Sequence, residues 1–179
     1  RNRMAERATH LDVERLAADL AVGTHLLRDI VSSLTRPALD PRDNLPPPDL
    51  QPDYLLDSFQ YPERLNAAVE LTDRMVERGF GDHVALIGNG RRRTYKELAD
   101  WSNRVAHALV ENYGVKPGNR VLVRSANNPA MVACWLAATK AGAVVVNTMP
   151  MLRPGELTQI VDQAQIQFAL CDTRIMDDL

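Results

Sequence analysis

The sequence predicts an α/β fold built on a βαβ unit with parallel strands. Residues 120–124 and 143–147 are short apolar runs rich in β-branched residues, which is typical of buried strands. Between them, apolar residues recur at helical spacing from 131 to 139. A strand, a helix and a strand at this spacing form a right-handed crossover, so the two strands should run parallel.

Length and composition limit the class of protein. The chain has 179 residues, of which 45% are apolar and 25% charged, as expected for a folded domain with its own core. The formal net charge of −2 gives no reason to expect a nucleic acid or an anionic membrane as partner. No apolar run is long enough to span a bilayer, and the first residues lack the apolar core of a signal peptide. We therefore expect a cytoplasmic protein.

The first part of the chain, residues 1–36, is predicted to form an amphipathic helix. Apolar residues recur by three, four and seven between Val13 and Leu34, close to a heptad seam that is broken at Gly23 and Thr24. We favour docking of this helix on the chain's own body, because only a few heptads are present. The alternative is pairing with a partner helix, which would give a homo-oligomer.

Residues 37–62 follow as a proline-rich linker. Proline cannot occupy a helix interior or a central strand, so we expect an extended path over the surface. The alternative is a proline-rich recognition ligand at 46–48. That alternative is disfavoured, because aromatic grooves select spaced prolines and this stretch is short.

Residues 63–179 are predicted to contain the main folded part. Its first elements are expected in this order: a helix over 63–78, a strand over 83–87, a tight turn at Asn89 and Gly90, and an edge strand at 91–93. The three arginines of the edge strand suggest a phosphate or nucleic-acid contact. We favour protection of the sheet edge against association, because the net charge is near zero.

Two helix starts are marked by capping residues. Thr94 and Glu97 can form a capping box, and the helix they open should end near Tyr113. Asn128 is placed to cap the helix of the βαβ unit, with Pro129 at its first position, where a missing N–H has no cost.

The chain continues after the βαβ unit with a helix that opens at Pro154 and a third parallel strand over 166–171. It begins with Arg1 and stops at Leu179, just where a further helix starts. We therefore expect it to be part of something longer.

The motifs of common nucleotide and hydrolase sites are missing. The nine glycines form neither G-x-G-x-x-G nor G-x-x-x-x-G-K, which disfavours a dinucleotide-binding domain and a P-loop enzyme. The four histidines have no carboxylate or serine at a suggestive spacing, so no catalytic triad is predicted. Cys134 and Cys171 lack C-x-x-C spacing, and we predict buried free thiols rather than metal ligands.

Three stretches resemble motifs of the adenylate-forming, or AMP-binding, enzyme superfamily. Residues 93–98, RTYKEL, are similar to its first core motif, and residues 139–147, TKAGAVVVN, to its second. Pro150 falls a few residues later than the proline of that second motif. Residues 118–121, GNRV, match a G-D-R-V turn in which Asn119 replaces the aspartate.

Within that superfamily the chain resembles the aryl acid–CoA ligases, especially 2-aminobenzoate– and benzoate–CoA ligases. The likeness lies in residues 43–47, 61–66 and 127–137, and it extends over roughly 40–179. Residues 1–36 have no counterpart. The resemblance implies that residues 63–179 are the first, incomplete part of the large N-terminal domain of such an enzyme.

The resemblance implies a ligase that uses ATP, Mg and CoA on a small-molecule carboxylic acid. The acid would first become an acyl-adenylate and then a CoA thioester. The chain lacks the family's phosphate loop, its ribose-binding aspartate and its C-terminal lysine. It is therefore expected to be an inactive scaffold portion with no catalytic residue or metal ligand. The loop after the second motif implies CoA-binding candidates at Thr148, Met149 and Arg153, although these residues could equally cap a helix and fill a loop.

Two other functions remain open. The parent could be another acyl-CoA synthetase, such as a fatty acyl one, because the residues that select the acid are not in this chain. The second is a stand-alone, non-catalytic interaction module that binds a partner through the helix in residues 1–36.

Overall fold

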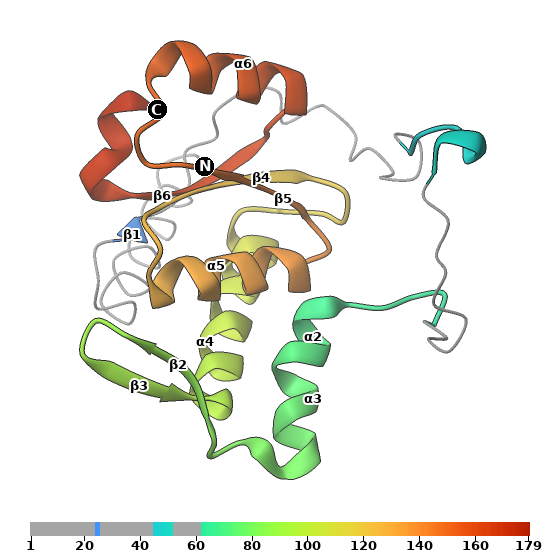
Figure 1. Ribbon diagram of the computed structural model, residues 1–179, viewed down its shortest axis with the longest axis vertical. Helices are drawn as coiled ribbons and strands as arrows, with labels where there is room; N and C mark the ends of the chain where they lie inside the picture. Colours follow the sequence, from blue (N-terminus) through green and yellow to red (C-terminus); the bar gives the residue numbers. More distant parts are fainter. Residues whose placement is uncertain (1–23, 26–44, 52–61) are drawn as a thin grey trace, which may run out of the picture.

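The structure of the protein is a computed structural model, which describes three parts of the chain: residues 24–25, 45–51 and 62–179 (Figure 1). Most of the predicted helix in 1–36 and of the predicted linker over 37–62 lies outside these residues. The described part of the linker contains one exposed 3-10 turn, Pro48–Leu50, in place of a fully extended path. Proline at the first position of that turn favours it, because its missing N–H is not needed there.

A four-stranded sheet forms the centre of the fold, in the order β1–β6–β4–β5. Its strands have these bounds: β1 Thr24–His25, β4 Arg120–Arg124, β5 Val144–Thr148 and β6 Phe168–Asp172. β4, β5 and β6 are parallel, whereas β1 pairs antiparallel with β6. The predicted parallel βαβ core is confirmed. Thr24 and His25 are not helical, which corrects the predicted helix at these two positions, because their backbone extends the sheet beside β6.

Alternate residues of β4 enter different cores on the two faces of the sheet. Leu122 packs with Ile166 and Ala169 on the face that α6 (Pro154–Ala164) covers. Val121 and Val123 belong to the larger core on the opposite face, which α5 (Pro129–Lys140) and α4 (Tyr95–His107) cover (Figure 1). A strand buried on both faces must be apolar at every inner position, which explains the uninterrupted apolar run.

The capping residues begin the helices at the predicted positions. Thr94 Oγ1 accepts a hydrogen bond from the Glu97 N–H at 3.2 Å, and the Thr94 N–H donates to Glu97 Oε2 at 2.8 Å. Asn128 Oδ1 accepts from the Met131 N–H at 2.9 Å and opens α5. α4 continues as a π-helical turn over Ala108–Asn112 and is capped at Tyr113, as predicted.

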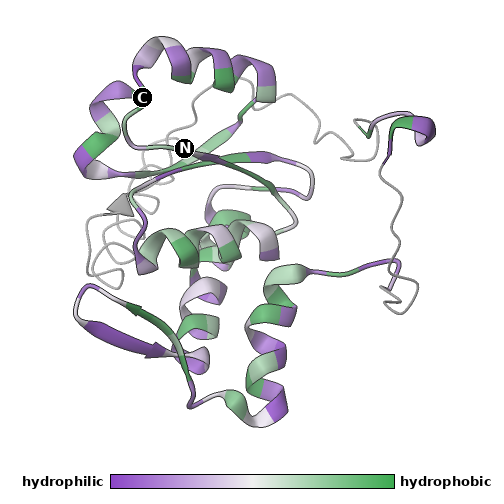
Figure 2. Ribbon diagram, in the orientation of Figure 1, coloured by the Kyte–Doolittle hydropathy of each residue, from purple (hydrophilic) through white to green (hydrophobic). Residues whose placement is uncertain are grey.

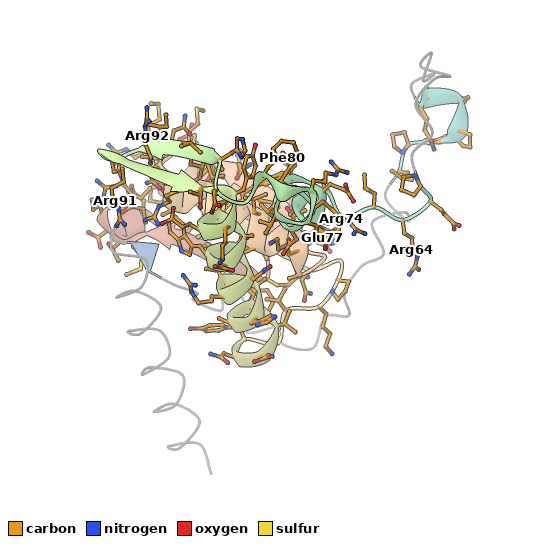
Figure 3. The ribbon with its side chains drawn as sticks, turned by 90° about the horizontal axis from the view of Figure 1, so that it is seen from below. Arg64, Arg74, Glu77, Phe80, Arg91 and Arg92 are labelled. Carbon is orange, nitrogen blue, oxygen red and sulfur yellow. The ribbon has the colours of Figure 1, made fainter. Side chains whose placement is uncertain are left out.

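A two-stranded hairpin of β2 (Val84–Gly88) and β3 (Arg91–Thr94) lies beside α4. Asn89 and Gly90 both have positive φ, 51° and 72°, as the predicted tight turn requires. β2 is apolar and β3 is hydrophilic (Figure 2). Arg91 and Arg92 extend from this hairpin, and both are exposed (Figure 3). Their role at the edge stays a prediction.

The helix predicted over 63–78 begins later and is interrupted. Asn66 caps it by accepting hydrogen bonds from the Ala68 and Val69 N–H groups, so α2 spans Ala67–Leu71. The Thr72 hydroxyl donates to the Ala68 carbonyl at 2.6 Å, which competes with the helical bond and accompanies a break at Thr72. α3, Asp73–Met75, and a π-helical turn over Val76–Phe80 continue the segment.

Candidate functional site

The carboxyl ends of the parallel strands form the candidate site. β4 ends at Arg124, which pairs in register with Thr148 at the end of β5 and with Cys171 near the end of β6. Arg124, Thr148 and Asp172 are all buried although their side chains are polar. In open parallel sheets, ligands bind outside the carboxyl ends of the strands, and polar residues gathered there indicate such a site.

Arg124 is the largest wholly buried side chain of the described residues, with 0% exposed. Its guanidinium donates hydrogen bonds to four backbone carbonyls and contacts one carboxylate. The acceptors are Met149 O at 3.0 Å, Pro150 O at 3.0 Å, Leu152 O at 2.9 Å, Ile175 O at 3.3 Å and Asp178 Oδ2 at 3.3 Å. Sequence reasoning placed Arg124 at a strand end and missed this role. The signal available was a charged residue at the end of a strand whose three inner residues are apolar.

The three predicted CoA-binding candidates lie on the segment that Arg124 contacts. Thr148 is the last residue of β5, and its buried hydroxyl has no hydrogen-bond partner among the described residues. Met149 is 59% exposed, and the Arg153 side chain is 77% exposed. The structure thus brings the three residues to the carboxyl end of the sheet, where one hydroxyl is buried and two side chains are exposed. Their role stays a proposal.

The loop of residues 149–153 ends where α6 begins. The Arg153 backbone is extended, and its N–H donates to Glu156 Oε2 at 3.0 Å. Pro154 then occupies the first helical position, where its fixed φ suits the helix. The local sequence therefore fixes where the loop ends and α6 begins. It thereby fixes the position from which the Arg153 side chain extends.

Asp178 lies between two arginines at the carboxyl end of the sheet. Its Oδ2 is 3.3 Å from Arg124 Nη2 and 3.6 Å from Arg153 Nη1. One carboxylate therefore faces two guanidinium groups, which leaves one positive charge in excess within this group of three. An excess positive charge on an exposed arginine suits an anionic ligand, phosphate above all, because the guanidinium binds oxyanions with two parallel hydrogen bonds.

The neighbouring β6 terminus carries a second ion pair and a buried thiol. Hydrogen bonds from the Arg174 guanidinium hold the pKa of Asp172 below its ordinary value, although burial opposes this. Burial raises the pKa of the Cys171 thiol to about 11, and that of Cys134 to about 12. Both thiols are free and protonated at neutral pH, which confirms the prediction of buried cysteines and argues against a nucleophilic role.

Across the described residues, no helix is both long and apolar enough to cross a bilayer. No set of three or more His, Cys, Asp or Glu side chains in them could hold a metal ion.

Comparisons with known proteins agree with the motif resemblance. A family model described as AMP-binding enzyme matches residues 73–179. A 3-hydroxybenzoate–CoA ligase of Aromatoleum sp. (strain CIB) is 32% identical over 108 residues, which cover 60% of this chain and 20% of the ligase. A 3-hydroxybenzoate–CoA/4-hydroxybenzoate–CoA ligase of Thauera aromatica is 29% identical over 120 residues, covering 67% of this chain and 23% of the ligase.

A solved structure shows the same arrangement of elements. Klebsiella oxytoca NpsA, in complex with 3-hydroxyanthranilyl-AMSN, superimposes with a TM-score of 0.52 and 28% sequence identity. The match covers 57% of this chain and 21% of NpsA. The chain thus spans about a fifth of the length of the relatives it matches. The family model covers more than half of the chain, and the predicted resemblance to the AMP-binding superfamily is confirmed. The chain belongs to the AMP-binding enzyme family.

Proposed function

We propose that the intact protein is an ATP-dependent acid–CoA ligase that acts on benzoate or 2-aminobenzoate. The acid carboxylate attacks ATP to give an acyl-adenylate and pyrophosphate, and the CoA thiol then displaces AMP to give the thioester. The observation that carries this proposal is the family match over residues 73–179, with hydroxybenzoate–CoA ligases among the relatives. A cytoplasmic location, where ATP and CoA are supplied, goes with it.

Within that enzyme, this chain would supply scaffold rather than the adenylation residues. A phosphate-binding loop with lysine, a ribose-binding aspartate and a lysine on the C-terminal domain are all missing from the sequence. The parallel sheet and its two apolar cores instead hold the carboxyl ends of β4, β5 and β6 in register. ATP and its Mg would therefore be held by residues outside this chain.

The loop after β5 is the part of the chain that fits CoA. CoA carries several phosphates and an adenine ring, and it supplies the thiol that accepts the acyl group. Arg153 presents an exposed guanidinium for a phosphate, and Met149 presents an exposed apolar side chain for a ring. The Thr148 hydroxyl, buried at the strand end, still has its hydrogen-bonding capacity unused among the described residues.

The test is a substrate panel on the intact protein. Acid-dependent pyrophosphate release and CoA thioester formation would be measured with benzoate, 2-aminobenzoate and medium-chain fatty acids. Aromatic acids should give the higher kcat/KM, and activity should require ATP, Mg and CoA. Higher kcat/KM with medium-chain fatty acids would favour the other acyl-CoA synthetase, and no acid-dependent pyrophosphate release would remove the ligase proposal.

A further inference from the structure

The Arg124 guanidinium is buried at a cost that must be offset by its contacts. A charged group taken out of water is strongly destabilising unless it is paired and hydrogen-bonded. Arg124 has 0% exposure, and Asp178 is its sole ion-pair partner among the described residues. The remaining stabilisation comes from four backbone carbonyls. These carbonyls belong to a loop and a turn, and Met149 O uses its second lone pair for the Leu152 N–H at 3.3 Å.

Three of these four carbonyls belong to one short loop. Met149, Pro150 and Leu152 lie between the end of β5 and the start of α6, and each accepts from an Nη atom at 2.9–3.0 Å. Nε reaches Ile175 O, in the 3-10 turn that follows β6. A single side chain at the end of the central strand β4 therefore hydrogen-bonds both the loop that follows β5 and the turn that follows β6.

Lysine could not make the same set of contacts. The guanidinium is planar and carries five N–H donors in a fixed fork, whereas an ammonium carries three donors on one atom. The Arg124 contacts are divided among its nitrogens: Nη1 and Nη2 donate to the loop after β5, and Nε donates to the turn after β6. An Arg124→Lys variant would keep the charge and most of the volume but would leave some of these carbonyls without their donor.

We propose that Arg124 is a positioning residue for the CoA-dependent step. Its hydrogen bonds hold residues 149–153 in the conformation that presents Met149 and Arg153 outward, beside the end of β5. Asp178 takes part by pairing with both arginines, so that the buried and the exposed guanidinium share one carboxylate. This inference rests on the proposed function, and it assigns the loop's order to a residue that does not itself reach the surface.

The experiment is Arg124→Lys in the intact ligase, with the two half-reactions measured separately. ATP–pyrophosphate exchange driven by the acid needs no CoA, and thioester formation does. We expect the KM for CoA to rise about tenfold, while the KM values for ATP and acid in the exchange reaction stay within about twofold. A merely structural role would impair both half-reactions together, so equal effects on both would overturn the proposal.

Two further variants sharpen this result. Arg92→Lys makes the same substitution at an exposed arginine of the β2–β3 hairpin, and its KM for CoA should stay within about twofold of wild type. Arg153→Ala combined with Arg124→Lys should raise the KM for CoA no more than the worse single variant, because both act through one loop. If the two substitutions raised the KM for CoA by independent factors that multiply, the proposal that Arg124 acts through the loop carrying Arg153 would be overturned.

A variant that leaves Arg124 in place covers the case in which Arg124→Lys does not fold. Pro150→Gly loosens the contacted loop itself, because glycine removes the restriction on φ. It should raise the KM for CoA and spare pyrophosphate exchange, and an unchanged KM for CoA would overturn the proposal. Absence of thioester formation in the wild-type enzyme would instead overturn the proposed function, so the two failures are distinguishable.

Discussion

The Lys140 ammonium lies 2.6 Å from Asp73 Oδ2 and joins the end of α5 to the start of α3. Asn103 of α4 completes the group, since its Oδ1 accepts from Lys140 Nζ at 2.7 Å and its Nδ2 donates to Asp73 Oδ1 at 2.9 Å. The Lys140 side chain is only 6% exposed. Three helices are therefore joined by one polar group whose buried charge depends on a single carboxylate among the described residues.

Removing the charge of Asp73 should destabilise the protein strongly. Asp73→Asn leaves the Lys140 ammonium buried without its counter-ion, and we expect a loss of about 2–3 kcal/mol in the free energy of unfolding, because Asp73 itself is partly exposed. Glu77→Gln is the matched control, since Glu77 pairs with Arg74 on the exposed surface of the same segment (Figure 3). Its effect should stay within about 0.5 kcal/mol. Urea unfolding measures the free energy of unfolding of both variants. Similar losses in the two would contradict the conclusion that Lys140 and Asp73 form a buried ion pair.

The same carboxylate should make stability depend on pH. Burial acts to raise the pKa of Asp73, but hydrogen bonds from Lys140, Asn103 and Thr72 outweigh it and hold the pKa below its ordinary value. A lowered folded-state pKa gives stability that is present above the unfolded pKa, about 3.9, and is lost as the pH falls through the folded pKa. The stability difference between wild type and Asp73→Asn should therefore shrink between pH 6 and pH 3. A constant difference would show that Asp73 carries no such linkage.

The capping box at the start of α4 should contribute a measurable amount. Thr94→Ala removes the acceptor for the Glu97 N–H, and we expect a loss of about 1 kcal/mol in the free energy of unfolding. Thr158→Ala serves as a control, because Thr158 lies exposed inside α6 and caps no helix. That change should be neutral or slightly stabilising, given alanine's higher helix propensity. Equal effects of the two substitutions would mean that the cap is not the cause.

Gly142 should tolerate no side chain. Its φ is 75°, and a Cβ there would lie 3.1 Å from Pro117 Cβ and 3.3 Å from Pro117 Cα. Gly142→Ala should lower the free energy of unfolding by at least about 1–2 kcal/mol, because the left-handed conformation alone has that cost for a residue with a Cβ. Gly155→Ala, in α6, meets no atom within 4 Å and should stabilise the protein slightly. Thermal unfolding of the pair would contradict this account if Gly142→Ala were as stable as Gly155→Ala.

The two cysteines should be unreactive in the folded protein. Both thiols are buried with raised pKa values, about 12 for Cys134 and about 11 for Cys171, so neither forms appreciable thiolate at pH 8. A chromogenic disulfide reagent should find no fast-reacting thiol in buffer and both of the two thiols in denaturant. Rapid reaction of one thiol in buffer would show that this thiol is accessible in the folded protein and would contradict the prediction.

Local signals predicted the elements well. The capping box at Thr94, the cap at Asn128 and the turn at Asn89 each depend on residues within a few positions of one another, and all three lie where expected. The helix predicted over 63–78 instead begins at Ala67, because the Asn66 side chain caps it there. The break at Thr72 depends on a side-chain hydrogen bond that residue type alone does not indicate.

Long-range relationships were not predictable in the same way. The three parallel strands were predicted, but their order was not, because nothing within a strand says which two neighbours will hydrogen-bond to its edges. Arg124 was placed correctly on its strand, but its acceptors lie on loops that are distant in sequence. The candidate residues after β5 came from family resemblance, whereas the guanidinium beneath them is visible only in three dimensions.

Strand β1 is only two residues long, but it changes how the first part of the chain should be treated. Thr24 and His25 pair with Asp172 and Cys171, so they lie along the outer side of β6 at the end where the loops meet. A protein trimmed to begin at residue 37 would expose the backbone N–H and C=O groups of β6 at that end. Exposed strand edges template pairing with other chains. Self-association of such a trimmed protein would therefore report a missing strand, and it would give no measure of how the intact chain assembles.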